Sequence, residues 1–534
     1  MPKSNIGLCN TCRGRVPAEF FTRDGAKWLR KECPTCGPTE SLVSSDAAVW
    51  QAKRDLWNYV PLARAACEMH CDTCHVNHKP NIVFVDVTNR CNMNCPICIA
   101  TIRGMGFDFN PPIEYFDHLF EEVAKIQPNP VVLFFGGEPT VREDLMDLMN
   151  VARKHGLRPH VVTNGLRLAD EDYCRMLCEK GVPFRFGFDG QQPEIYEKLR
   201  HNRAACDKKL KALDNLDRFS RRKQTIIATA GKGYNDIYMA DFFQYIYDRR
   251  DLISDVGIIP LTENWEPGTF DAGVHTTMED VEKMVATAIG GDEVEFIPAG
   301  LSYALRKMRS FFRKNPRSEV LLLAGAHPNC ESMTLLVSDG QRFRGINRYL
   351  RRPFHEVAAE FAALANKLDP KLEKLDRDKF FQRFRGQLLI LAAVLPWAIK
   401  RVRIGRALFS SPLGRLGRFL TGRSKPQRQS AAGERVSARR PRGVLRVAML
   451  PFEEEHSIDA ARLEHCKGVF AYEQADTGEV RYAPACLWYP YRNAILKKLS
   501  EKYGVVRYRG PDKTPVVVRD LSGEAEALPT AAGG

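Results

Sequence analysis

Apolar runs and helical patterns alternate between about residue 80 and residue 300. Each short β-branched or aromatic run reads as a buried strand, and a stretch with helical spacing of its apolar positions follows it. The strand-like runs are 81–88, 131–135, 160–165, 184–190, 224–230 and 256–262. Six strand–helix units without a hairpin signal predict a parallel sheet that curls into a partial (β/α)6 barrel, which is an α/β fold.

The loops that follow the first two strands carry unusual residues. "RCNMNCPIC" (90–98) comes after the first strand, and "FGGEPT" (135–140) ends the second. Because the chemistry of such barrels lies in loops after strand C-termini, we expect both loops at one end of the barrel. A capping box of Thr140 and Glu143 predicts that the next helix begins there and ends at Gly156.

These two loops hold the first candidate site. Its residues are Cys91, Cys95, Cys98, Gly136, Gly137, Glu138 and Pro139. Three thiolates on one short loop can hold three irons of a [4Fe–4S] cube and leave the fourth iron open to an outside ligand. The two glycines are expected where backbone approaches a ligand closely, and the carboxylate, fixed by the proline, is suited to hold an ammonium group. Zinc ligation or plain core packing of the three thiols is the alternative.

Two CxxC pairs near the N-terminus predict a separate metal site. Cys9 and Cys12 form one pair, Cys33 and Cys36 form the other, and twenty residues separate the pairs. Each pair presents two thiolates from a tight turn, so the four fit one tetrahedral ion. Spacing alone leaves zinc and a single iron both open.

A second cysteine triplet repeats the spacing of the barrel loop but precedes the first barrel strand. No glycine–carboxylate element accompanies it, so we interpret it as part of an auxiliary cluster that takes a further ligand from elsewhere. The candidate ligands are Cys67, Cys71, Cys74, Cys330, Cys466 and Cys486. The last three flank strand-like segments with turns at 339–340 and 477–478, and we place all three at strand edges.

Composition limits the class of protein. The chain has 534 residues, 44% of them hydrophobic, and opens without an apolar leader, so a cytoplasmic protein is expected. Its sixteen cysteines are then more consistent with metal ligands than with disulfides. Thirteen Lys or Arg and a single acid in 400–442 account for +12 of the net charge of +14. The rest of the chain therefore has no general attraction for nucleic acid, and none is expected as a partner.

The basic segment adjoins an apolar one. "GQLLILAAVLPWAI" (386–399) is shorter than the roughly twenty residues that span a bilayer, and arginines flank it. Apolar residues among arginines are typical of an element that lies on anionic lipid headgroups, on the inner face of the membrane. A helix packed on the barrel is the alternative. The Ser-, Gly- and Arg-rich stretch that follows predicts a disordered linker.

The barrel motifs resemble those of the radical S-adenosylmethionine (SAM) superfamily. That resemblance implies a [4Fe–4S] cluster whose open iron binds the amine and carboxylate of S-adenosylmethionine, and a 5′-deoxyadenosyl radical that abstracts hydrogen from carbon. It implies that the "GGE" segment holds the methionine amine. It also implies that Asn164, Asp189 and Arg200 hold the carboxylate and ribose.

Within that superfamily the chain resembles the tetraether lipid synthase group, also called membrane-spanning lipid synthases. The likeness runs from Cys9 to about Tyr491 and fails in roughly 370–445. It implies an iron in the N-terminal knuckles, more than one auxiliary [4Fe–4S] cluster, and carbon–carbon coupling of lipid alkyl chains. We expect at least one auxiliary cluster and an electron donor such as flavodoxin or ferredoxin. Radical alkylation or methylation of a soluble, pterin-like molecule and iron–sulfur modification of nucleic acid are the alternatives.

The sequence divides the chain into a barrel flanked by metal-binding regions. We expect an N-terminal four-cysteine knuckle domain like a rubredoxin or zinc ribbon, and a C-terminal α+β region that carries auxiliary clusters. The expected boundaries are 1–50 for the knuckles, 51–80 for the auxiliary triplet, 81–300 for the barrel, 301–370 and 446–510 for the auxiliary-cluster regions, 371–445 for the apolar–basic insertion and 511–534 for a disordered tail.

Overall fold

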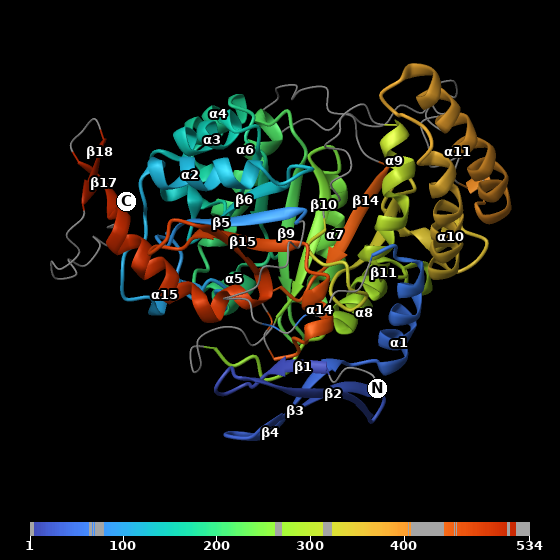
Figure 1. Ribbon diagram of the computed structural model, residues 1–534, viewed down its shortest axis with the longest axis horizontal. Coiled ribbons are helices and arrows are strands. Elements are labelled where there is room, and N and C mark those ends of the chain that lie inside the picture. The colour runs from blue at the N-terminus through green and yellow to red at the C-terminus, as the bar shows by residue number, and fades with distance from the viewer. Residues whose placement is uncertain are drawn as a thin grey trace.

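The computed structural model describes residues 5–62, 67, 69, 80–261, 270–312, 323–403, 405–406, 443–452, 454, 456–509 and 513–518. A small antiparallel sheet lies at one end of the molecule and a large, mostly parallel sheet occupies its centre (Figure 1). Helices cover the outer face of the large sheet, and three further helices stand beside it.

The six predicted barrel strands are confirmed and lie in sequence order. They are β5 (Ile82–Thr88), β6 (Val131–Gly136), β7 (Arg158–Thr163), β8 (Phe184–Gly187), β9 (Gln224–Ala230) and β10 (Ile253–Pro260). All neighbours in this series pair in parallel. β5 is buried along its whole length, as the β-branched run predicts.

Segments far along the chain extend this sheet at both edges. β14 (Val444–Met449) pairs in parallel with β10, and β15 (Gly468–Glu473) pairs in parallel with β5. Outside these lie β11 (Ile297–Pro298), β12 (Ser332–Ser338) and β13 (Phe343–Gly345) on one side and β16 (Val480–Pro484) on the other. The twelve-stranded sheet therefore includes strands from the regions that the sequence had placed beside the barrel.

The helices between the strands cover the outer face of the barrel (Figure 1). They are α2 (Ile113–Ala124), α3 (Leu145–Lys154), α4 (Glu171–Glu179), α5 (Pro193–Arg200), α6 (Ala205–Phe219), α7 (Met239–Asp248) and α8 (Met278–Ile289). The predicted start of α3 is wrong. Thr140 does not cap it, because the Thr140 hydroxyl and N–H both donate to Glu138 instead, and the helix begins at Leu145.

The C-terminal region mixes hairpins with helices. The predicted turns at 339–340 and 477–478 join β12 to β13 and β15 to β16. The strand β16 ends at Pro484, where the long helix α15 (Ala485–Tyr503) begins. Cys486 therefore lies in the first turn of a helix and not at a strand edge. The remaining short elements are α14 (Ala460–Glu464), β17 (Val505–Arg509) and β18 (Thr514–Val518).

The N-terminal residues form a four-stranded antiparallel meander. Its strands are β1 (Asn5–Leu8), β2 (Arg15–Arg23), β3 (Ala26–Cys33) and β4 (Gly37–Ser44), and α1 (Ala47–Asp55) leads from it to the barrel. The meander contacts the α14 region, where the Asn5 side chain donates to Asp459 at 3.2 Å.

Three helices stand beside the barrel at the right of Figure 1. They are α9 (Arg306–Phe312), α10 (Phe354–Leu372) and α11 (Phe380–Arg401). The apolar run 386–399 is thus helical, and one side of α11 packs against α9 and α10. No helix among the described residues is long and apolar enough to cross a membrane. Most of the predicted linker, residues 407–442, lies outside the described part of the chain.

Candidate active site in the barrel

The barrel cysteines lie together on the loop after β5. Cys91, Cys95 and Cys98 are half-buried, and all three line a cavity of about 300 Å³ inside the barrel. The Asn89 side chain holds the start of this loop in place. Its amide donates to the Phe107 carbonyl at 2.7 Å and its oxygen accepts from the Phe109 N–H at 2.9 Å.

The two glycines of the second loop allow the cysteine loop to come close. The Gly137 N–H donates to the Thr88 carbonyl at 2.7 Å, and the Glu138 N–H donates to the Arg90 carbonyl at 2.8 Å. A Cβ on Gly137 would lie 2.1 Å from the Arg90 oxygen, and one on Gly136, whose φ is +117°, would lie 2.3 Å from the Thr88 oxygen. In this structure the close approach that requires glycine is therefore to the chain's own backbone, where the sequence had indicated a ligand.

Glu138 is buried and held by four donors. Its Oε1 accepts from the Thr140 N–H, the Thr140 hydroxyl and the Thr163 hydroxyl, and its Oε2 accepts from the Asn164 N–H at 2.6 Å. Burial raises the pKa of this carboxyl above its ordinary value despite these donors. A carboxylate has about four lone-pair positions, so Oε2 can accept another donor from the cavity that Glu138 lines. Pro139 opens the short 3₁₀ turn that fixes this geometry.

Asp189 and Arg200 form a buried bidentate ion pair. The Arg200 Nε and Nη2 donate to the two Asp189 oxygens at 3.0 Å each, and Nη2 also donates to the Thr229 hydroxyl. Burial alone would raise the pKa of Asp189, but Arg200 holds it below its usual value. The pair lies beside the Cys95 thiol, whose charge interaction adds to that of Asp189 in raising the pKa of Arg200.

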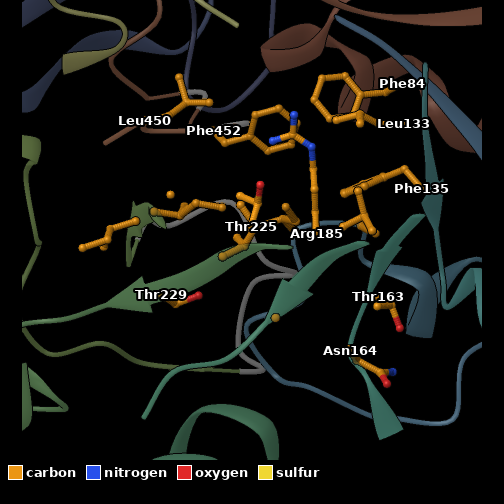
Figure 2. Close-up of a pocket in the computed structure, with 18 of the residues that line it drawn as sticks. Phe84, Leu133, Phe135, Thr163, Asn164, Arg185, Thr225, Thr229, Leu450 and Phe452 are labelled. Atoms are coloured by element: carbon orange, nitrogen blue, oxygen red, sulfur yellow. The ribbon is translucent and has the colours of Figure 1, made fainter. Parts of the chain in front are cut away.

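Asn164 lies beside the cysteine loop. Its side-chain amide donates to Asn92 at 2.8 Å and lies 3.8 Å from the Cys91 sulfur. Thr163 ends β7, Asn164 follows it, and Thr229 is near the end of β9, so all three lie at one end of the cavity in Figure 2. The structure therefore brings together all the site residues that the sequence placed in the barrel.

Sequence reasoning missed Lys209. Its Nζ donates to the Asn164 carbonyl at 2.7 Å and to the Gly187 carbonyl at 2.5 Å, and burial lowers its pKa to about 8. Lys209 lies on the buried face of α6, and this lysine within an apolar stripe was the signal that could have revealed it. The apolar members of the stripe are Ala205, Cys206, Ala212, Leu213 and Leu216.

A second missed group joins the C-terminal helix to the cysteine loop. Arg492 and Trp488, one turn apart on α15, both donate to the buried Asp86 of β5. Arg492 also donates to the Ala100 carbonyl, two residues after Cys98. Burial raises the pKa of the Cys98 thiol, and the Arg492 charge opposes that rise. No pattern in the sequence connects residues so far apart.

The cavity extends from the thiols into the middle of the barrel. Its central part is mainly apolar, and Phe84, Leu133, Phe135, Leu450 and Phe452 line it in Figure 2. Phe452 follows β14 and packs against the far side of the barrel. Its ring lies 5.1 Å from the Phe84 ring of β5 and 6.2 Å from the Phe135 ring of β6.

The N-terminal thiols converge as the two CxxC pairs predict. The sulfurs of Cys9, Cys12, Cys33 and Cys36 all lie within 4.8 Å of one another. A tetrahedral ion with metal–sulfur bonds of about 2.3 Å places its sulfurs about 3.8 Å apart, so this set fits a single ion. Among the described residues no other group of His, Cys, Asp or Glu meets this criterion.

The candidate auxiliary ligands lie around Arg462. Cys330, Cys466 and Cys486 are buried, and the Arg462 guanidinium interacts electrostatically with the thiols of Cys330 and Cys486. Burial raises the pKa of Cys330 to about 12. Cys67 packs against the apolar cluster that contains Cys486. The other two members of that triplet, Cys71 and Cys74, lie outside the described residues.

Family models match two parts of the chain. Residues 85–246 match the Radical SAM superfamily, and residues 1–45 match the HMPTM N-terminal zinc ribbon domain. These ranges cover the parallel strands β5–β9 and the four-cysteine meander.

Curated relatives share this architecture to different extents. The chain is 29% identical to 7,8-dihydro-6-hydroxymethylpterin dimethyltransferase of Methanocaldococcus jannaschii over 64% of this chain and 69% of that protein. It is 34% identical to Fe-coproporphyrin III synthase of Methanosarcina barkeri over 28% of this chain and 38% of that protein. By their names one of these relatives methylates a pterin and the other forms a porphyrin, so they do not support the expected likeness to tetraether lipid synthases.

Two solved structures align with parts of the chain at low identity. SuiB of Streptococcus suis is 12% identical, with a TM-score of 0.28 over 50% of this chain and 64% of that chain. Methylornithine synthase is 16% identical, with a TM-score of 0.32 over 45% of this chain and 67% of that chain.

Proposed function

We propose that this chain, a member of the radical SAM superfamily as its motifs predict, alkylates or methylates a small organic molecule held inside the barrel. The observation that carries the proposal is the cavity itself. It joins the three thiols and the polar residues at the strand C-termini to an apolar interior of about 300 Å³. A cavity of this size is at the lower end of the range for small-molecule sites.

The donor set at the strand C-termini fits the cofactor. Cys91, Cys95 and Cys98 would hold three irons of a [4Fe–4S] cluster, and Glu138 would accept a donor on its remaining lone pair. When bound, the cluster and S-adenosylmethionine supply a carbon radical that abstracts hydrogen from the substrate. The chain's own residues orient the cofactor and exclude water. Asn164, Asp189 and Arg200 are the polar groups in place to hold its carboxylate and ribose, and Lys209 positions the Asn164 backbone.

The pterin relative favours this substrate class over lipids. Its similarity extends over 64% of this chain, which is more than the barrel alone, and its name describes methylation of a reduced pterin. The aromatic side chains of Phe84, Phe135 and Phe452 give the cavity flat apolar walls suited to a planar ring.

The remaining metal sites follow from the cysteine positions. Cys9, Cys12, Cys33 and Cys36 would hold one zinc or iron ion. Cys67, Cys71, Cys74, Cys330, Cys466 and Cys486 would supply ligands to at least one auxiliary [4Fe–4S] cluster, with Arg462 balancing its negative charge. A flavodoxin or ferredoxin would supply the electron.

The test uses anaerobically reconstituted protein with a strong reductant, S-adenosylmethionine labelled in its methyl group, and 7,8-dihydro-6-hydroxymethylpterin. We expect 5′-deoxyadenosine, and an alkylated or methylated pterin detected by mass spectrometry. Absence of 5′-deoxyadenosine would refute the radical chemistry. Its formation without any change in the pterin would refute this substrate class.

Coupling of lipid alkyl chains is a second candidate, which the exposed face of α11 favours. Apolar side chains on one side of this helix are between 42% and 82% exposed: Phe380, Phe381, Phe384, Leu388, Leu391, Leu395 and Ile399. Lys400 and Arg401 end the helix. An apolar face with basic flanks suits the surface of an anionic membrane, where each basic residue contributes about 1 kcal/mol.

Vesicle cosedimentation tests this second candidate. Wild-type protein should bind phosphatidylglycerol vesicles at low salt, and binding should weaken at high salt because screening shortens the reach of the charges. A variant with Leu388→Ser, Leu395→Ser and Ile399→Ser should lose binding without losing 5′-deoxyadenosine formation. Equal binding of the wild type and this variant would remove the support that α11 gives to a membrane substrate.

A further inference from the structure

Charged groups gather at the end of the cavity farthest from the cysteine loop. Arg185, Asp255, Glu331 and Arg446 all line it there, at or near the strand N-termini. Three of the four are satisfied by protein partners. Asp255 accepts from Arg446 at 2.8 Å. Glu331 accepts from the backbone N–H groups of residues 324 and 325 at 2.7 and 3.3 Å.

Arg185 is the exception. Within the described chain no hydrogen bond or ion pair joins its guanidinium to another residue, and its Nε is buried without an acceptor. Figure 2 shows the side chain rising from β8 into the cavity, between Phe135 and Thr225 and toward Phe452. The next inward position on β8 is Gly187, which leaves space beside the side chain.

A half-buried cation that faces a largely apolar cavity without a protein partner is destabilising. Burial lowers the pKa of Arg185 to about 10, and the nearby charge of Arg446 lowers it further, while Asp255 and Glu331 only partly offset the two effects. Buried arginines are normally paired, because an unpaired guanidinium in an apolar interior costs several kcal/mol. Such an unfavourable group is typical of a binding site, where a ligand supplies the missing partner.

The surroundings of Arg185 define the ligand that would complete it. The guanidinium matches a carboxylate or a phosphate, which it can bind through two parallel hydrogen bonds. Phe84, Leu133, Phe135 and Phe452 line the neighbouring part of the cavity, so the part of the ligand that follows the anion is expected to present a flat or apolar surface. The other end of the cavity opens on Cys91, Glu138 and Arg200, where the reaction is proposed to begin.

We propose that Arg185 binds the anionic end of the substrate, a carboxylate or a phosphate, and so fixes which carbon of its apolar part faces the cysteine loop. That the ligand is the substrate rests on the proposed function, whereas anion binding at Arg185 does not. The substrate class is then an organic acid or phosphate ester with one charged end and a flat or apolar body, and a pterin fits this class when it carries a carboxylate or a phosphate. An anchor at the strand N-termini would set the distance between the charged end and the reacting carbon.

The test measures binding to cluster-reconstituted protein with S-adenosylmethionine and no reductant, so no turnover occurs. The probes are octanoate, octyl phosphate and octanol, which share one chain length and differ in charge. Calorimetry on the wild type should show tighter binding of at least one anion than of octanol. Arg185→Met should weaken that anion about 10- to 100-fold, the range of a charge-assisted hydrogen bond, and change octanol less than twofold. The anion that loses affinity identifies the carboxylate or the phosphate as the natural group.

A matched control separates the site from general charge. Arg158 lies on the neighbouring strand β7, donates to the Asn129 carbonyl at 3.3 Å and does not line the cavity. Arg158→Met should leave the anion affinity unchanged, and Arg185→Lys should retain part of it. Without ligand, Arg185→Met should unfold at the wild-type temperature or above, because it removes an unpaired buried charge. Equal losses for octanol and the anions, or equal effects of the two Met variants, would overturn the proposal.

Different results would refute the anion site at Arg185 and the proposed function. Wild-type protein that forms 5′-deoxyadenosine but binds octanol at least as tightly as both anions would overturn the anchor alone. An anion preference that Arg185→Met removes, in a protein that alkylates no small molecule, would refute the proposed function and leave the anchor standing.

Discussion

The two best-defined cysteine sites are assembled in opposite ways. Cys9, Cys12, Cys33 and Cys36 come from two turns of one small meander, and their sulfurs already lie within 4.8 Å of one another. The barrel thiols share a single loop, but residues distant in the chain hold that loop in place. Gly137 of the next strand approaches it closely, and Arg492 reaches it from the C-terminal helix.

The pKa values of the thiols also differ between the two sites. Backbone N–H groups of Cys12 and Thr11 lower the pKa of Cys9 to about 6, so this thiol favours the charged form that a metal needs. A hydrogen bond with Cys12 and burial raise the pKa of Cys36 to about 12, so this thiol keeps its proton until a metal displaces it. At Cys91, burial and the nearby carboxyl of Glu138 raise the pKa far above that of a free thiol. The meander therefore prepares its own cation site, whereas the barrel loop depends on a bound cluster and on Arg492 for positive charge.

Loss of one barrel thiol should have the largest effect. Cys95→Ala leaves only two protein ligands for the cluster, so we expect at least a thousandfold loss of 5′-deoxyadenosine formation, measured by chromatography under strong reductant. The N-terminal ion should remain, because no residue of the meander changes. Metal analysis should therefore show that the N-terminal ion and the auxiliary-cluster iron persist.

A variant of the N-terminal site tests the converse. Cys33→Ser should remove the N-terminal ion and leave most of the 5′-deoxyadenosine formation. If Cys95→Ala retained full cleavage activity, the assignment of the barrel loop as the cluster site would be wrong.

The buried ion pair between Asp86 and Arg492 should give the next largest effect. Both side chains are at most 4% exposed, so Arg492→Met leaves an unpaired buried carboxylate. We expect a loss of about 3–5 kcal/mol in the free energy of unfolding, measured by urea denaturation, together with reduced cluster iron. The double variant with Asp86→Asn should recover part of the loss, because no charge is then left unpaired.

An exposed pair is the matched control for this prediction. Arg481 donates to Glu479 on the surface near β16, and Arg481→Met should cost less than about 1 kcal/mol. Equal losses for Arg492→Met and Arg481→Met would mean that α15 does not support the cysteine loop.

The sequence predicts those parts of the fold and the sites whose residues are close together in the chain. Spacing alone indicated the four-cysteine site and the barrel loop, because their ligands are close in sequence. The alternation of apolar runs indicated β5 to β10, because parallel strands buried on both faces leave that pattern. Strands β14 and β15 also join the parallel series, but their partners lie hundreds of residues away and local patterns do not record pairing.

The errors have the same physical origin. Thr140 resembled a helix cap, but the buried Glu138 takes both of its donors. The segment at Cys486 resembled a strand, but helical spacing is what brings Trp488 and Arg492 to Asp86 on one face of α15. Lys209 was missed because a lysine in an apolar stripe is read as exposed until its carbonyl partners are known.

A smaller effect is expected where the two loops of the barrel touch. Gly137→Ala would place a Cβ 2.1 Å from the Arg90 carbonyl, which is backbone and cannot rotate away. We expect a loss of about 1–3 kcal/mol in unfolding free energy and lower cluster occupancy, measured by iron and sulfide content. The Cβ of Gly405→Ala would meet no atom of the described residues within 4 Å, so this variant is the control. Normal iron content in Gly137→Ala would show that loop contact does not position the thiols.

The smallest effect concerns protons at the N-terminal site. A metal displaces the protons of its thiol ligands, so four neutral cysteines would release four protons per ion. Because the pKa of Cys9 is lowered to about 6, this thiol is already charged at pH 7.5, and zinc should release about three protons. Calorimetric titration of chelator-stripped, cluster-loaded protein in two buffers of different ionisation enthalpy measures this number, with Cys33→Ser as the blank for other sites. The released number should approach four as the pH falls below 6, where Cys9 is protonated. A release of four protons at pH 7.5 would mean that the backbone N–H groups do not prepare this site, and the electrostatic contrast with the barrel loop would be lost.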